Sequence, residues 1–242
     1  MNKEEFFKLI KSHIDNEGYH LTIVSGNSAL PRYAYTIGLK EVFNFEIVFA
    51  GAEYYKKDEI KLIIENLFNE LNKGIDWKSL KVDLGTLGTF TLSSAHSSWS
   101  KLMLLGVWDY YKIDDLMVLQ VIPSKKYFTL DIPNMLNMYN YLSEPVWKWL
   151  TQKWNYPVQE NSIVFTNTET LFGKKITEVM RWEENEWEMF AGNGEEIPKE
   201  NLRAVSLGTI LGIDPTLMPS IELPIEKGMW RDEKVLEWNS WG

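Results

Sequence analysis

Residues 19–51, YHLTIVSGNSALPRYAYTIGLKEVFNFEIVFAG, set the character of the fold. They contain three short runs of β-branched and aromatic residues, at 19–25, 33–39 and 45–51, separated by Gly, Asn, Ser and Pro. Such runs predict strands joined by turns. The period then changes, because residues 57–72 place apolar side chains on one side of a helix, with Gly74 just past its end. Strands and helices therefore mix from the start of the chain.

The same patterns continue along the rest of the sequence. Helical spacing predicts a first helix from Asn2 to just before Gly18. Further strands are predicted at 86–94, 116–123, 176–182 and 187–191, and further helices at 101–111 and 207–213. The last two strands flank an acidic turn, which indicates a strand pair. We expect an α+β protein of two small mixed α/β domains with mainly antiparallel sheets.

Charge is distributed unevenly along the chain. Residues 157–242 contain 16 Asp and Glu against 8 Lys and Arg, a formal charge of −8, whereas the whole chain carries −9. Residues 1–156 are therefore nearly neutral. An aromatic stretch at 134–157 ends where the acidic part begins, so we predict domains at 1–156 and 157–242. An acidic surface repels phosphate backbones and lipid headgroups and attracts basic partners.

Composition excludes several classes of protein. No run of about 18 apolar residues is present, so no membrane span is predicted. Basic residues occur as isolated pairs rather than as a stripe, which argues against nucleic-acid binding. The chain contains no cysteine, so disulfides and thiol chemistry are excluded. The first residues lack the apolar region of a signal peptide, and we expect a cytoplasmic bacterial protein.

Few residues suggest catalysis or metal binding. The three histidines, His13, His20 and His96, match no spaced zinc motif. The serines around His96 lack the Gly-x-Ser-x-Gly pattern of a nucleophile elbow. We therefore predict no catalytic residue, no metal site and no cofactor, and we favour a protein that is not an enzyme.

An alternative hypothesis places a ligand pocket in the first domain, for a small molecule or a hydrolytic reaction. It requires His20 and His96 to lie close together in a concave polar site. The residues of this pocket would be His20, Tyr33, Tyr35, Thr36 and His96. Residues 35–39 also fit a simpler interpretation, a buried strand that bends at Gly38.

The acidic domain offers a candidate partner surface. Tryptophan beside carboxylates is typical of interface hot spots. The candidate residues are Glu183, Glu184, Glu186, Glu195, Glu196, Trp230, Asp232, Glu233, Trp238 and Trp241. Trp182 and Trp187 flank the acidic turn and are expected to pack inside. For Trp238 and Trp241 a second interpretation is open, a terminal strand that closes the domain.

Part of the first domain resembles a known family. EGYHLTIV at 17–24, YAYTIGL at 33–39, FEIVF at 45–49 and VLQV at 118–121 resemble segments of the bacterial domain-of-unknown-function family 4262. The likeness covers about residues 15–135. Phe45-Glu46 stands where that family has Pro-Glu, and FTLD at 128–131 replaces its Pro-Trp. The resemblance implies no activity.

The acidic domain resembles a second family. VMRW at 179–182, EWEMFAG at 186–192, SLGTILGIDP at 206–215 and WRD at 230–232 are similar to the domain-of-unknown-function family 2185. Asn185-Glu186 replaces that family's Asp-Ser-Gly. Members include immunity proteins of bacterial polymorphic toxin systems. The resemblance implies a non-enzymatic protein that neutralises a basic, secreted toxin through its acidic domain. A third hypothesis is a structural module in which residues 138–154 form an oligomer interface.

Overall fold

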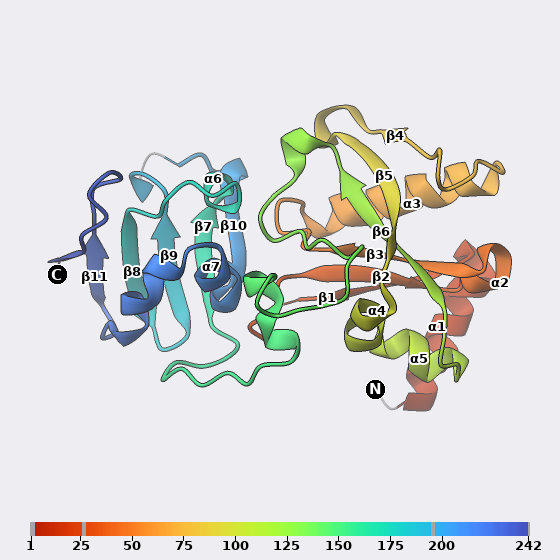
Figure 1. Ribbon diagram of the computed structural model, residues 1–242, viewed down its shortest axis with the longest axis horizontal. Helices are drawn as coiled ribbons and strands as arrows, with labels where there is room; N and C mark the ends of the chain where they lie inside the picture. The colour runs from red at the N-terminus through yellow and green to blue at the C-terminus, as the bar shows by residue number, and fades with distance from the viewer. Residues whose placement is uncertain (1–2, 26–27, 195–196, 242) are drawn as a thin grey trace. The chain divides into compact units, whose positions relative to one another are not determined.

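The chain forms two compact units, each built on its own six-stranded sheet (Figure 1). The computed structural model describes residues 3–25, 28–194 and 197–241. The first unit comprises residues 1–24, 33–128 and 134–139, and the second comprises 25–32, 129–133 and 140–242. Both sheets are mixed and mostly antiparallel, which confirms the expected α+β class.

The first sheet has the strand order β1-β2-β3-β6-β5-β4. Only the β3–β6 pair is parallel; the other neighbours are antiparallel. The bounds are β1 His20–Val24, β2 Tyr33–Ile37, β3 Phe45–Ala50, β4 Val82–Asp83, β5 Thr89–Ala95 and β6 Met117–Pro123. The sequence expectation for residues 116–123 is met by β6, and the strand expected at 86–94 begins later, after the 3₁₀ turn η1 Gly85–Leu87.

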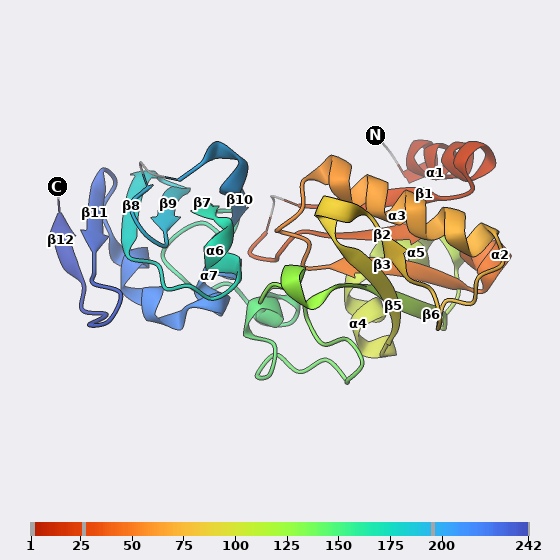
Figure 2. The same ribbon diagram turned by 90° about the horizontal axis from the view of Figure 1, so that it is seen from above.

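Helices cover both faces of the first sheet (Figures 1 and 2). The helix α3 has the predicted bounds, Lys57–Asn72, and buries its apolar side against one face. The other face carries α4 Ser97–Met103 and α5 Leu105–Tyr111 (Figure 2). The Tyr33 hydroxyl of β2 donates to the Met103 carbonyl of α4 at 3.2 Å. The remaining elements are α1 Lys3–Glu17, α2 Lys40–Phe43 and the 3₁₀ turn η2 Lys125–Tyr127.

One helix expected at 101–111 is two helices in the structure. Leu104 separates α4 from α5 because its ψ of 48° lies outside the helical range. The indole of Trp108 donates to the Ser100 carbonyl at 2.9 Å and so holds the second helix against the first. Periodicity alone did not reveal this break, since apolar residues continue through it.

The second sheet has the strand order β10-β7-β9-β8-β11-β12. Only the β7–β9 pair is parallel. The strand bounds are β7 Ile163–Asn167, β8 Glu178–Glu183, β9 Glu186–Phe190, β10 Leu202–Ser206, β11 Lys227–Trp230 and β12 Asn239–Trp241. The antiparallel β8–β9 pair confirms the hairpin expected around the acidic turn. The Arg181 guanidinium supports that turn by donating to the carbonyls of Glu183 and Glu184.

One face of the second sheet carries the core of this unit. Val164, Val179, Trp187, Met189 and Val205 alternate along their strands and are buried. The buried helix α7 Leu207–Ile213 lies on the strands in both views, and no α-helix of the described residues covers the opposite face (Figures 1 and 2). The other elements are α6 Thr168–Leu171 and the 3₁₀ turns η3 Pro145–Leu150, η5 Lys199–Asn201 and η6 Pro215–Glu222.

The boundary expected at residue 156 differs from the observed division. Residues 140–156 belong to the second unit, together with 25–32 and 129–133. Two glycines of α7 explain this packing, because a Cβ at Gly208 would overlap the Ala29 carbonyl oxygen and one at Gly212 would lie 2.5 Å from the Val146 Cα. The indole of Trp147 also donates to the Asp131 carbonyl at 2.8 Å. Close backbone contacts therefore attach these segments to α7.

Candidate functional site

One face of the second sheet has no covering α-helix in the part of the chain that the structure describes (Figure 2), and we call this the open sheet face. Paired residues of adjacent strands share a face, so the register assigns its members. They include Ile163, Phe165, Glu178, Met180, Glu186, Glu188, Phe190, Leu202, Ala204, Gly228, Trp230, Asn239 and Trp241, and the lining of the groove described below adds Trp182, which lies in the irregular part of β8. These positions include three glutamates and neither lysine nor arginine. The open sheet face is thus both apolar and acidic.

A groove of about 560 Å³ lies on the open sheet face, and we call it the open-face groove. Its lining comes from four strands and from the Asn193–Gly194 segment. The side chains that the open sheet face contributes are Glu178, Met180, Trp182, Glu188, Phe190, Leu202 and Trp241. This volume is in the range typical of ligand sites, about 300–1,000 Å³.

The carboxylates of this face differ in their partners. Glu178 Oε2 accepts a hydrogen bond of 3.0 Å from the Gly194 amide. Glu186 and Glu188 are only partly exposed, and neither side chain forms a hydrogen bond or ion pair with another residue that the structure describes. Charged groups that lose part of their hydration are normally paired. Two partly buried, uncompensated negative charges therefore lie on the strand at the middle of this sheet.

The terminal tryptophan lies across the edge of this face. Met180 pairs with Gly228, and Gly228 pairs with Trp241, so the three residues form one row across β8, β11 and β12. A Cβ at Gly228 would overlap the indole nitrogen of Trp241. The missing side chain at Gly228 therefore lets the indole lie over β11. β12 is the terminal strand that the second interpretation of Trp238 and Trp241 expected.

The predicted partner residues separate into several locations. Glu186, Trp230 and Trp241 belong to the open sheet face, and Trp230 is 44% exposed. Glu183 and Glu184 are exposed at the β8–β9 turn. Asp232 and Glu233 are exposed after β11, where the Asp232 carboxylate accepts from the Lys234 amide at 2.8 Å. Glu195 and Glu196 lie outside the described residues. The structure thus brings only part of the predicted set to one face.

Two further tryptophans, Trp238 and Trp182, have different outcomes: Trp238 packs as its second interpretation expected, whereas Trp182 is exposed. The Trp238 ring packs on the Arg231 guanidinium, whose central carbon lies 4.2 Å from the ring centroid, and its indole donates to the Thr216 carbonyl at 3.2 Å. Trp238 therefore closes the domain. Trp187 is fully buried as expected, but the expectation that Trp182 packs inside is wrong, since 45% of it is exposed. The two-residue alternation of β8 places Trp182 on the face opposite the buried Val179.

Sequence reasoning missed Glu178, Met180, Glu188 and Leu202. A signal was present in β8 and β9, where Glu, Met and Trp alternate with the buried Val179, Trp187 and Met189. This alternation indicates an acidic face, but the pairing of β10 with β7, which adds Leu202, involves segments too far apart in the sequence to be inferred from either one.

The histidines of the possible ligand pocket do not meet. His20 begins β1 and His96 follows β5, so β2, β3 and β6 lie between their strands. Four strand spacings correspond to about 19 Å. His20 Nδ1 instead lies 2.8 Å from His13 Nδ1 of α1, and His96 Nδ1 caps α4 by accepting from the Ser98 amide at 3.2 Å. His20 and His96 therefore do not form the close pair that the pocket hypothesis requires.

Tyr33, Tyr35 and Thr36 are buried in β2. Burial raises the pKa of Tyr33 to about 12, so its hydroxyl stays protonated, and that hydroxyl donates to the backbone of α4. Tyr35 lies against α5, where a Cβ at Gly106 would be 2.6 Å from its hydroxyl. These contacts favour the simpler interpretation of this segment as a buried strand.

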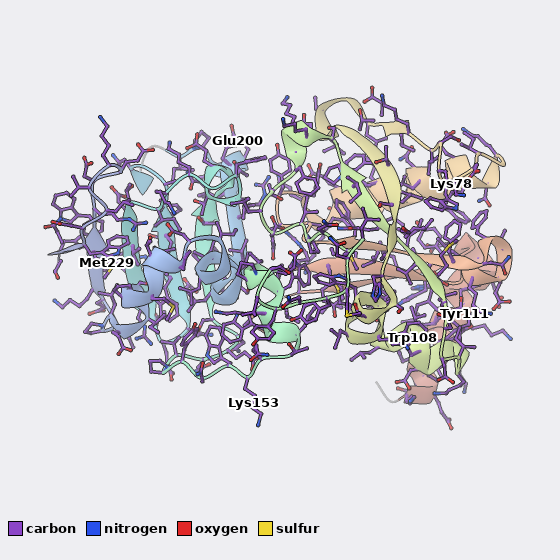
Figure 3. All side chains as sticks on the ribbon, viewed as in Figure 1. Lys78, Trp108, Tyr111, Lys153, Glu200 and Met229 are labelled. Atoms are coloured by element: carbon purple, nitrogen blue, oxygen red, sulfur yellow. The ribbon has the colours of Figure 1, made fainter. Side chains whose placement is uncertain are left out.

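A buried carboxylate that the sequence did not single out lies beside this strand. Glu46 Oε2 accepts from the Thr36 hydroxyl at 2.6 Å, and Oε1 accepts from the Gly38 amide at 2.9 Å. Oε1 also accepts from the Tyr111 hydroxyl at 2.7 Å and the Lys40 amide at 3.1 Å. Tyr111 projects from α5 (Figure 3). Burial raises the pKa of Glu46, while these donors oppose that shift. Both carboxylate oxygens of Glu46 therefore accept hydrogen bonds, and these bonds connect β3 with β2 and α5.

The described residues offer no metal centre, because no group of three or more His, Asp or Glu side chains among them has a suitable arrangement. No helix in the described ranges combines the length and apolar character needed to cross a bilayer. Comparison with known proteins gives no further guide: no family model, curated protein or solved structure matches this chain. The geometry of the open sheet face is therefore the basis for a functional proposal.

Proposed function

We propose that this chain is a non-enzymatic binding protein of the bacterial cytoplasm, of the immunity type, which neutralises a basic protein toxin through the open sheet face of its second unit. The observation that carries the proposal is the composition of that face. It combines exposed tryptophans, Trp182, Trp230 and Trp241, with the partly buried and uncompensated Glu186 and Glu188. Such a surface suits a partner whose cations face these carboxylates.

The charge of the second unit supports the same partner. Its residues include 18 Asp and Glu and 11 Lys and Arg, a formal charge of −7, whereas the first unit carries −2. A surface of one sign steers an oppositely charged protein over roughly 8 Å at physiological ionic strength. Nuclease toxins are basic because they bind phosphates, so the immunity interpretation of the resemblance to family 2185 requires an acidic face.

A capture experiment with matched variants tests the proposal. Tagged full-length protein is incubated with host lysate, and bound proteins are identified after elution at about 0.5 M salt, where the Debye length falls to roughly 4 Å. We expect a basic protein that the salt step releases. The double substitution Glu186→Gln/Glu188→Gln should reduce its retention at least about tenfold, because the partner's cations lose their counter-charges.

The control removes the same charge elsewhere in the second unit. Glu160 and Glu169 are exposed and lie outside the open sheet face, so Glu160→Gln/Glu169→Gln should leave capture unchanged. Capture of a partner that both double variants retain equally would contradict the proposed surface. A partner that resists high salt, or is acidic, would contradict the proposed electrostatic basis.

A further inference from the structure

We infer that the open-face groove is an anchor site for one arginine side chain of a protein partner, with Glu188 as its counter-charge and the indoles of Trp182 and Trp241 as its aromatic contacts. The inference rests on the proposed function and deepens it by naming the chemical group that this surface receives.

The carboxylates of the groove favour a cationic ligand. Glu188 lies on β9, which has neighbouring strands on both sides, and its charge has no partner among the described residues. An uncompensated, partly buried carboxylate costs stability unless a cation or donors satisfy it. Glu178 lines the same groove and is held by the Gly194 amide. A cationic ligand would neutralise a charge that the described residues leave without a counter-charge.

The aromatic lining of the groove favours the same kind of ligand. Trp182 and Trp241 both line the groove and are 45% and 37% exposed. Gly228 provides the space that the Trp241 indole occupies, and this places the ring beside Met180 in the next strand. Indole faces attract cations, and the attraction grows when the cation is partly desolvated. The groove therefore offers both a negative charge and aromatic surfaces to the same ligand.

The spacing of the two carboxylates and the aromatic rings favour a guanidinium over other groups. Glu178 pairs with Phe190, and Met180 pairs with Glu188, so the two carboxylates occupy diagonal positions of the β8–β9 ladder. Diagonal neighbours lie about 7–8 Å apart, within reach of long side chains. A guanidinium presents five N–H donors in one plane and stacks on aromatic rings, whereas an ammonium is a compact, strongly hydrated charge. An apolar side chain would desolvate both carboxylates without pairing them.

The test uses a blocked arginine, Nα-acetyl-arginine-N-methylamide, and the full-length ¹⁵N-labelled protein. The indole N–H signals of Trp182 and Trp241 are assigned with single Trp→Phe variants and followed during titration to about 20 mM. We expect saturable shifts at both indoles with a dissociation constant on the order of 1 mM, the range of a small ligand with few contacts. The neutral citrulline analogue should bind at least about tenfold more weakly because it lacks the charge.

Two variants and one control locate the site. Glu188→Gln should weaken arginine binding about tenfold by removing the counter-charge, and Trp241→Leu should weaken it by a similar factor by removing an aromatic contact. Glu160→Gln removes a charge from the same unit outside the groove and should leave the affinity unchanged. Trp241 is exposed near the end of the chain, so its variant keeps the test available if Glu188→Gln impairs folding.

Absence of saturable indole shifts, or equal binding of the arginine and citrulline probes, would overturn the inference. The proposed function fails by a different result, because it depends on capture of a basic protein through Glu186 and Glu188. A captured partner together with no arginine binding would refute the anchor and keep the docking surface. Arginine binding without any captured basic protein would support the anchor and contradict the immunity-type function.

Discussion

Arg231 and Asp214 form a buried ion pair whose removal should destabilise the second unit. Their side chains are 0% and 4% exposed, and Arg231 Nη2 lies 2.9 Å from Asp214 Oδ2. The same guanidinium donates to the Ile176 carbonyl at 2.6 Å and to the Thr216 hydroxyl at 2.7 Å. Arg231→Met keeps most of the apolar stem but leaves a buried carboxylate and two acceptors with fewer partners.

The expected loss follows from these contacts. Breaking a buried pair by removing one partner costs about 3–5 kcal/mol. Lys175 still lies 3.1 Å from Asp214, so we expect the lower end, about 3 kcal/mol. For a unit of this size that corresponds to a fall in melting temperature of about 12 °C. Lys175→Met is the matched control: its side chain is 39% exposed, and the loss should stay below about 1 kcal/mol.

Urea denaturation followed by circular dichroism measures both variants. Although burial alone would raise it, the pKa of Asp214 is held below its ordinary value of 3.8 by hydrogen bonds from Thr216 and Lys175 and by the charges of Lys175 and Arg231. The ionised carboxylate therefore stabilises the fold above that ordinary value, and this contribution is lost as pH falls through the lower, folded pKa. The difference between wild type and Arg231→Met should shrink over this window. A loss under about 1 kcal/mol at pH 7, or an equal loss for Lys175→Met, would refute the reasoning.

Three further outcomes are expected. Tyr111→Phe removes a donor to the buried Glu46, so the free energy of unfolding in urea should fall by about 1–3 kcal/mol; no change would show that Glu46 does not depend on this hydroxyl. Gly228→Ala forces the Trp241 indole off β11, which an altered indole N–H signal would report; an unchanged signal would contradict the close contact. Burial lowers the pKa of His20, so neutral His20 stabilises the fold above pH 6.5, and this contribution is lost as pH falls through the folded pKa. The urea midpoint of the wild type should therefore be lower at pH 5 than at pH 8, and His20→Gln should reduce this difference.

Local patterns predicted the elements whose signals are contained within a few turns of chain. The apolar spacing from Ile60 to Leu71 reproduced α3 to the residue, because a helix buries one stripe with a 3.6-residue period. The β8–β9 hairpin was also found, since both strands adjoin its turn. The sequence patterns did not predict β4, β7, β10 and β11, because β4 has only two residues and the other three each pair with a strand that is not their neighbour in the chain. Only the second interpretation of Trp238 and Trp241 expected β12.

For the candidate site, too, some features could be predicted from the sequence and others depended on strand order. Its acidity and its tryptophans were visible as composition after Pro157, and the Glu186 and Trp241 positions were chosen from that signal. The possible pocket in the first unit depended on His20 and His96 meeting, and the strand order separates them. Strand order depends on contacts between segments that are distant in the sequence. The spacing of residues within one segment carries no information about those contacts.

The amino-acid sequence alone was sufficient for the α+β class, for α3, and for an acidic last third in a chain without cysteine, because periodicity and composition can be read without knowing the tertiary structure. It was not sufficient for the open sheet face. That face is open because α7 packs on the other side of the second sheet and no α-helix of the described residues covers this one (Figure 2). Side-chain alternation then exposes Trp182, Glu186 and Glu188 together, and only the register of strands distant in sequence brings Leu202 and Trp241 to the same surface.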